Sequence, residues 1–297
     1  MANDLQNVNL AKLAQESLPA FVETFAPLNA FTTDFSTEIA SSGASIGTRY
    51  VDALTGNGDM TAGYAAASED VTYNPVTVTL DKWKGFTIGF TDLERSKAEF
   101  SLKDDFIIPG LEVVGSLLFN DLWALVTAAN FAADTTIAAA NWDRDDLADL
   151  NATLNTAKII KTGRSVVQNP SYYASMVKTL NSAEIPGITE GKMEAIAPRI
   201  AKFDQWESTL ADDNSENLGA FACQKSALVI AARQIITDEM QTNAGVQNTT
   251  VIVPGLGLPV RMREWYDANN GIQYLNMNVL YGMSVGKPTA GVRVKSA

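Results

Sequence analysis

The residues that most often perform enzymatic chemistry are scarce in this chain. It contains no histidine and a single cysteine, Cys223. A Ser-His-Asp triad, a Cys-His pair and a histidine-ligated metal are therefore excluded, and one thiolate cannot build a zinc site. Cys223 follows Phe221 and Ala222, so we expect a buried structural thiol and not a nucleophile. We predict no cofactor and no metal site, and an enzyme would have to rely on carboxylates, lysine or tyrosine.

Adjacent carboxylates occur at three places along the chain: Asp104/Asp105, Asp145/Asp146 and Asp212/Asp213. Neighbouring side chains point about 100° apart on a helix and to opposite faces of a strand, so such a pair does not converge on one substrate. Each pair lies at a predicted helix start or in a polar loop. We therefore predict that these carboxylates cap helices or face solvent.

Two loops resemble ligand-binding motifs only in part. The run Gly255–Gly257 lacks the third glycine of a dinucleotide loop, and a predicted strand follows it where a helix is required. The run Asp267–Gly271 has neither the ligand spacing nor the final glutamate of a calcium loop. Since Asn-Gly favours tight hairpins, we predict that Asn270 and Gly271 form the turn between two strands.

The composition is that of a globular and acidic protein. The chain has 297 residues, of which 46% are hydrophobic and 19% are charged, with a net charge of -12. Such a chain is poorly suited to grip phosphates. Most of the negative excess lies in residues 1–160, which could steer a head-to-tail assembly or simply make a soluble surface. The polar start, the single cysteine and the lack of a long apolar stretch predict folding in a reducing cytoplasm without membrane insertion.

The N-terminal third predicts an unusual projection. Alternating apolar residues indicate strands at three places: 46–51, 76–80 and 86–90. Residues 53–70 are rich in glycine, alanine, serine and threonine, which is typical of an exposed loop tip, and residues 81–85 are expected to form a turn. We predict a long two-stranded excursion over residues 46–92. Since an isolated hairpin is marginal in water, it needs a partner surface.

The remainder predicts a long helix and a mixed lobe. Apolar residues at three-and-four spacing indicate a helix from Pro109 to Phe131. The other expected helices are 5–25, 145–160 and 170–180, and the other expected extended segments or strands are 31–39, 164–168, 227–231, 249–253, 258–265, 273–281 and 292–294. Residues 204–219 are predicted to form a polar loop.

Five residues are candidates for contacts between subunits. Lys82, Trp83 and Lys84 surround the expected turn of the excursion, and Arg261 and Arg263 lie in a locally basic C-terminal segment. Tryptophan is enriched among interface anchors, and a basic segment could face an acidic neighbour. A solvated turn with one anchored aromatic residue, and an exposed sheet bearing arginines, explain the same residues equally well.

The ordered set of elements resembles a known family. The stretches that carry the resemblance are Phe90–Glu94 before the long helix, Arg164–Pro170, Phe221–Arg233 and the strand pair Val260–Tyr266 with Gln273–Tyr281. Together they resemble the major capsid proteins of tailed bacteriophages, which have the α+β Hong Kong 97-type fold. The resemblance implies an N-terminal arm (1–45), an extended E-loop (46–92), a P-domain with a long spine helix (93–144), an A-domain (145–245) and P-domain return strands (246–297).

The resemblance implies a structural function and no enzymatic activity. Hexamers and pentamers of the chain would build the icosahedral head shell around double-stranded DNA, in the virion and after assembly in the host cytoplasm. The implied partners are a separate scaffolding protein, a portal, a decoration protein in some phages and weakly contacted DNA, with no membrane. No covalent cross-link can be assigned. Two alternatives stay open: an encapsulin-type nanocompartment, and a histidine-free carboxylate enzyme with two carboxylates about 5–10 Å apart in a cleft.

Overall fold

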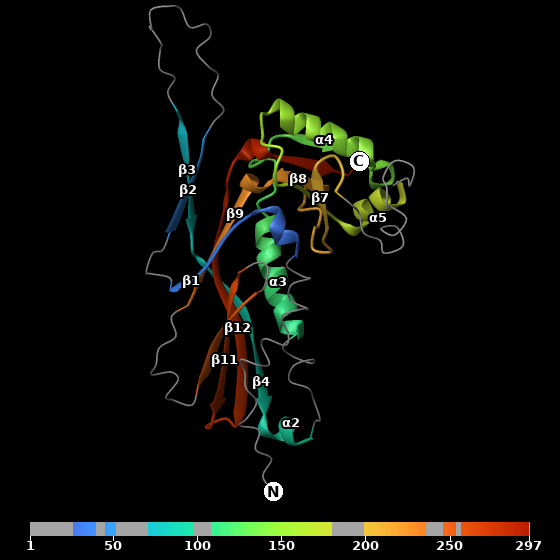
Figure 1. Cartoon of the computed structure of the whole chain (residues 1–297). Coiled ribbons are helices and arrows are strands. Elements are labelled where there is room, and N and C mark those ends of the chain that lie inside the picture. The colour runs from blue at the N-terminus through green and yellow to red at the C-terminus, as the bar shows by residue number, and fades with distance from the viewer. Residues whose placement is uncertain are drawn as a thin grey trace, which may run out of the picture.

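The computed structural model describes residues 26–39, 45–51, 71–97, 108–179, 199–235, 246–253 and 257–296. Within these ranges the strands form a six-stranded sheet, a five-stranded sheet and a two-stranded ribbon. Figure 1 shows the two sheets at opposite ends of an elongated molecule, with helix α3 lying along the first sheet. The predictions for residues 5–25, 53–70 and Asp104/Asp105 lie outside the described residues.

The first sheet is organised around one long strand, β12. Its strands are β1 (Thr32–Ile39), β4 (Lys82–Thr91), β9 (Leu228–Gln234), β10 (Gln247–Ile252), β11 (Pro259–Asp267) and β12 (Ile272–Val285). β12 pairs antiparallel with β4 and β11 through its first half and with β9 through its second half. Alternate residues of β12 are apolar and buried, which fixes its register toward the core. The predicted hairpin before β12 is present as a four-residue loop, because Asp267 pairs with Ile272.

Helix α3 (Ile108–Trp123) is shorter than the sequence predicts. Apolar spacing continues to Phe131, but the helix ends eight residues earlier because side chains bind the carbonyls of the next turns. The Asn214 Nδ2 donates to the carbonyl oxygens of Trp123 (3.3 Å) and Val126 (2.8 Å). The Asn130 Nδ2 donates to the carbonyl of Leu125 (2.7 Å). These bonds replace the helical ones.

The second sheet has the strand order β5-β13-β8-β6-β7. Its elements are β5 (Asp134–Thr136), β6 (Arg164–Gln168), β7 (Phe203–Glu207), β8 (Leu218–Gln224) and β13 (Gly291–Lys295), accompanied by α4 (Arg144–Thr156) and α5 (Pro170–Thr179). The predicted polar loop over residues 204–219 is wrong at both ends, because β7 pairs parallel with β6 and β8 begins at Leu218. The C-terminal strand β13 lies between β5 and β8.

Two predictions about chemically interesting residues are confirmed. The carboxylate of Asp143 accepts hydrogen bonds from the amides of Asp145 and Asp146, and the Asp146 carboxylate accepts one from the Asp143 amide, a capping box at the start of α4. The thiol of Cys223 is fully buried in the core, and this burial raises its pKa. A neutral buried thiol is a packing group, not a nucleophile.

Candidate intersubunit surfaces

The ribbon of β2 (Ser45–Val51) and β3 (Tyr73–Thr79) has one covered and one open face. Its strands pair antiparallel from Ser45 opposite Thr79 to Val51 opposite Tyr73. On one face, Ile46 and Val78 pack against Val229 and Ala231 of β9. On the other face, every residue of both strands is exposed, and Figure 1 shows the ribbon standing apart from the second sheet.

The open face of the ribbon carries an aromatic side chain held by an arginine. Tyr73 is 53% exposed, and the guanidinium carbon of Arg49 lies 4.7 Å from the centre of its ring. A cation over an aromatic ring restricts both side chains. The open face therefore presents an exposed aromatic ring paired with a cation, with Val51 exposed on the same face.

The predicted turn over residues 81–85 is wrong. Residues Lys82–Thr91 form one continuous strand, β4, that pairs with β12 of the first sheet. The predicted excursion over residues 46–92 is therefore too long. Its described two-stranded ribbon ends at Thr79, and residues Lys82–Thr91 belong to the first sheet as β4. Lys82 and Lys84 continue the alternation of Phe86 and Ile88 on the same face of β4, because a partly buried carboxylate pairs with both ammonium groups.

That partner is Asp121 of helix α3. The ammonium groups of Lys82 and Lys84 lie 3.2 Å and 2.8 Å from its Oδ2. The Tyr281 hydroxyl donates to the same oxygen at 2.7 Å. Burial opposes ionisation of Asp121, but the hydrogen bonds from Lys84, Tyr281 and Lys82 outweigh it, so the pKa of Asp121 lies below its ordinary value. Lys82 and Lys84 thus bind helix α3 to the sheet of their own subunit.

The other three candidate residues lie on the opposite face of the first sheet. Trp83 is 64% exposed, and the guanidinium carbon of Arg261 lies 6.0 Å from its ring centre. Arg263 lies 4.8 Å over the ring of Trp265, which stacks on Tyr274. Arg261 is itself buried, and this burial, followed by the charge of Arg263, lowers its pKa. The structure thus groups Trp83 with both arginines and separates them from the lysines.

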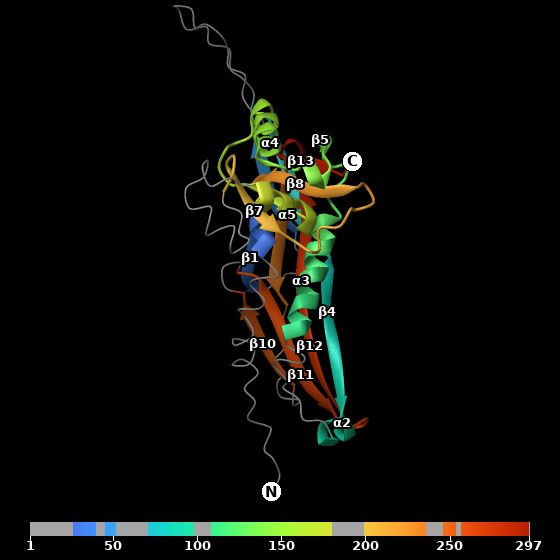
Figure 2. The same cartoon turned by 90° about the vertical axis from the view of Figure 1, so that its right-hand side faces the viewer.

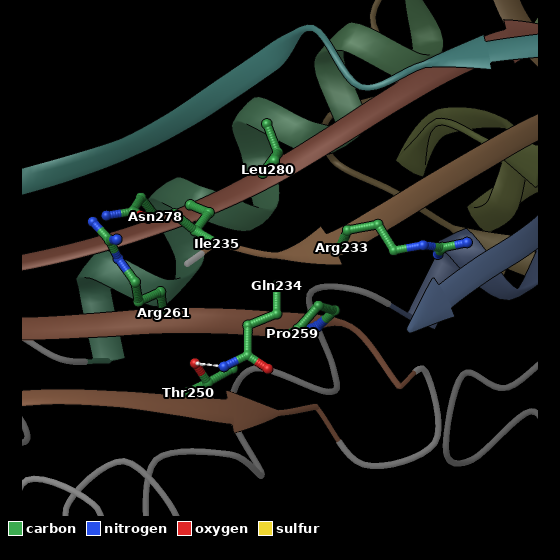
Figure 3. Close-up of a pocket in the computed structure, with 8 residues that line it drawn as sticks. All are labelled: Arg233, Gln234, Ile235, Thr250, Pro259, Arg261, Asn278 and Leu280. Carbon is green, nitrogen blue, oxygen red and sulfur yellow. Dashed lines mark hydrogen bonds between the residues drawn. The ribbon is translucent and has the colours of Figure 1, made fainter. Parts of the chain in front are cut away.

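A pocket opens on the same sheet where β9 and β11 meet beside β12 (Figure 3). Its lining consists of Arg233, Gln234, Ile235, Thr250, Pro259, Arg261, Asn278 and Leu280. The Gln234 Nε2 donates to the Thr250 hydroxyl at 3.0 Å. This lining holds no carboxylate, so it lacks the acid–base pair that a glycosidase mechanism requires. In the described part of the chain no group of three potential ligands could hold a metal ion. None of the described helices combines the length and the hydrophobicity of a membrane-spanning segment.

Sequence reasoning missed the arginines that organise the second sheet. Arg293 of β13 is buried, and its guanidinium lies 2.5 Å from the Glu216 carboxylate and 3.1 Å from that of Asp134. Its Nε also donates to the Phe131 carbonyl at 2.8 Å. Arg164 of β6 is fully buried as well. Arg164 precedes Val166 and Val167 in the predicted strand 164–168, and Arg293 lies between Val292 and Val294. A charged residue in a strand that is expected to be buried was the available signal, because it requires partners.

Solved structures of phage capsids match nearly the whole chain. The capsid structure of cyanophage P-SCSP1u matches with a TM-score of 0.60 and 10% identity, over 90% of this chain and 86% of that chain. The mature capsid of bacteriophage PhiM1 matches with a TM-score of 0.60 and 13% identity, over 90% and 86%. The chain has the fold of a phage capsid protein. The capsid of Myoviridae phage XM1 shares this capsid fold, with a TM-score of 0.54 and 14% identity over 93% and 92% of the chains. No protein-family model and no curated protein matches the sequence.

Proposed function

We propose that this chain is the major capsid protein of a tailed phage, and that its hexamers and pentamers build the icosahedral head shell around double-stranded DNA. The observation that carries the proposal is the fold, because solved phage capsids match 90% or more of this chain. The second support is the ribbon, since one of its two faces is exposed along its whole described length. A shell protein with this function belongs to the virion and needs no catalytic site.

The Hong Kong 97-type parts are assigned as follows. Residues 1–45 are the N-terminal arm, 46–92 the E-loop, 93–144 the P-domain with the spine helix, 145–245 the A-domain and 246–297 the return strands of the P-domain. α3 is the spine helix, β2 and β3 form the ribbon of the E-loop, and β4 at the end of that range pairs with β12 of the first sheet. Five of the described strands cross these boundaries: β1, β4 and β9 join the first sheet, and β5 and β13 join the second.

The contacts that build the shell are proposed on two surfaces. The open face of the ribbon, with Tyr73 and Arg49, lies on a neighbouring subunit. The outer face of the first sheet, with Trp83, Arg261 and Arg263, forms a second contact. Such contacts are heterologous, because they join two different surfaces of neighbouring copies. They generate closed assemblies when the rotations from one copy to the next add up to a full turn. A large tryptophan braced by arginine is the kind of side chain that dominates interface energies.

The proposed partners follow from this function. A scaffolding protein, a portal and, in some phages, a decoration protein would act with the shell. Packaged DNA is contacted only weakly, because a net charge of -12 leaves few cations for phosphates. A salt titration of DNA binding is expected to show low affinity at every ionic strength, and tight binding that weakens steeply with salt would contradict this.

The test is assembly of the purified full chain. Sedimentation and negative-stain microscopy over a range of concentrations are expected to show rings and closed shells above a threshold concentration. A monomer at all concentrations, with or without co-expressed neighbouring genes, would overturn the proposal. An encapsulin-type shell is distinguished by its contents: particles isolated from the producing cells would hold a cargo enzyme, whereas a phage head holds double-stranded DNA and carries a portal.

A further inference from the structure

Helix α4 lies at the end of the molecule away from α2 (Asp92–Lys97) (Figures 1 and 2), and an exposed isoleucine with nearby lysines follows this helix in the chain. Ile160, in the turn after α4, is 68% exposed. Lys158 and Lys161 flank it, and the exposed Lys225 side chain lies beside Gly163 of the same turn. We name Lys158, Ile160, Lys161 and Lys225 the basic knob. No ion pair joins these lysines to an acidic group among the described residues.

The basic knob is held rigidly from below by Arg164. This arginine is fully buried, and its Nε and Nη2 donate to the carbonyls of Ile160 (3.1 Å) and Ile159 (2.6 Å). Its Nη1 donates to the Asn151 side chain and, at 3.3 Å, to the Asn151 carbonyl. Lys158 adopts a φ of 56°, which sharpens the turn. A turn whose backbone is already held loses little backbone entropy on binding, which favours a role for its exposed isoleucine as an interface anchor.

The opposite end of the same helix carries the complementary charge. Asp143, Asp145, Asp146 and Asp149 crowd around the start of α4, and the Asp145 side chain is 83% exposed. Their ion-pair partner among the described residues is Arg144, at 3.4 Å from Asp145. Burial, and then the charges of the neighbouring aspartates, raise the pKa of Asp146. A cation brought by another molecule would relieve this repulsion.

The two charged ends cannot neutralise each other within one subunit. Helix α4 has 13 residues, so its ends lie about 20 Å apart at 1.5 Å per residue, beyond the screening length of roughly 8 Å at physiological salt. A symmetric contact of knob with knob would oppose lysine to lysine. A head-to-tail contact instead joins opposite charges at every interface, and such heterologous contacts generate rings.

We propose that the basic knob of one subunit docks on the acidic start of α4 in the next copy of this chain, head to tail around a ring. Ile160 is the apolar anchor, and the lysines select the orientation by facing Asp145 and Asp149. The inference rests on the proposed function, because it specifies the contact by which subunits of the shell close into hexamers and pentamers.

A charge swap in the full chain tests the contact. Lys158→Glu with Lys161→Glu reverses the knob, and Asp145→Lys with Asp149→Lys reverses its target. The matched control is Lys178→Glu with Lys202→Glu, which makes the same charge change elsewhere on the second sheet's lobe. Denaturation midpoints and circular dichroism confirm that each variant folds, and sedimentation measures the threshold concentration for ring and shell formation.

Each reversal alone is expected to raise the assembly threshold about tenfold or more, because it opposes like charges at every contact. The quadruple variant that carries both reversals should return toward the wild-type threshold, and the control should stay at it. The docking would be overturned if all variants, including the control, showed the same rise in threshold without rescue, or if none showed a rise. Shells formed by the wild-type chain would still uphold the proposed function in either case. Failure of the wild-type chain itself to assemble would count against the proposed function first.

Discussion

The second sheet and the ribbon are built from the same kinds of residues but obtain their stability in different ways. Every residue of β6 is buried, including Arg164 and Gln168, and its neighbour β8 is buried from Leu218 to Cys223. The ribbon buries one face at its base and leaves the other in solvent. The sheet is therefore stable within one subunit, whereas an open two-stranded ribbon gains most from a neighbour. Variants in the sheet should change folding, and variants on the ribbon's open face should change assembly.

The largest expected effect on folding is at Phe221, in the core of the second sheet. Its ring lies 4.9 Å from that of Phe131 and 6.5 Å from those of Phe31 and Trp123. Phe221→Ala should lower the free energy of unfolding by about 3–5 kcal/mol, because it leaves a cavity where aromatic rings meet. Urea denaturation of the unassembled chain measures this, with Phe221→Leu as the milder control. A change below about 1 kcal/mol would contradict an internally stabilised sheet.

A somewhat smaller loss is expected at Arg293. Its side chain is 4% exposed and bridges Glu216 and Asp134, whose carboxylates are partly exposed. Arg293→Met removes the cation that pairs with Glu216 and leaves Asp134 with Lys295 alone, and it should cost about 2–4 kcal/mol. The matched control is Lys295→Met on the same strand, which also removes a cation from Asp134 (2.6 Å) but is more exposed. Thermal denaturation that ranked the two variants equally would show that burial of Arg293 is unimportant.

The link between helix α3 and the first sheet should depend on pH. Because hydrogen bonds lower the pKa of Asp121 in the folded state, its contribution is present above its ordinary pKa and is lost as pH falls through the lower folded value. Asp121→Asn should cost about 1–2 kcal/mol at pH 7, since its lysine partners are partly exposed.

Urea denaturation of wild type and Asp121→Asn across the acid range measures this link. The difference between the two proteins should shrink toward zero as pH falls below about 4. A difference that stays constant with pH would show that the Asp121 charge does not hold the helix to the sheet.

The smallest effect on folding, but a large one on assembly, is expected at Tyr73. Tyr73→Ala should change the free energy of unfolding of the single subunit by less than about 0.5 kcal/mol, because the side chain lies on the open face. The same change should raise the assembly threshold, and Tyr73→Phe should preserve it. Sedimentation of both variants gives the comparison. A clear decrease in the free energy of unfolding of Tyr73→Ala, together with an unchanged assembly threshold, would contradict the difference between ribbon and sheet.

Local sequence patterns predicted much of the fold because alternation and buried runs decide strands such as β6, β11 and β12. They failed where a distant residue decides the outcome. Lys82 and Lys84 suggested a turn, but Asp121 makes them part of β4. The end of α3 depends on Asn214, far along the chain. No local signal contains such partners.

The candidate contacts were predictable only in part, for the same reason. Exposure of Trp83 follows from its place among polar neighbours. Strand register decides which side chains share a face of the sheet. It places Trp83 on the same face as Arg261 and Arg263, and it places Lys82 and Lys84 on the other face. The basic knob could not be foreseen, because a buried arginine and a turn after α4 create it.

The central claim is that the open face of the ribbon becomes covered only when copies of the chain assemble. Thr77 lies exposed on that face, and the native Cys223 is buried, so a Thr77→Cys variant carries one accessible thiol. The decisive measurement is the rate of maleimide labelling of this thiol in the free subunit and in the assembled particle. Rapid labelling of the subunit and strong protection in the particle are predicted. Equal rates in both states would contradict the account.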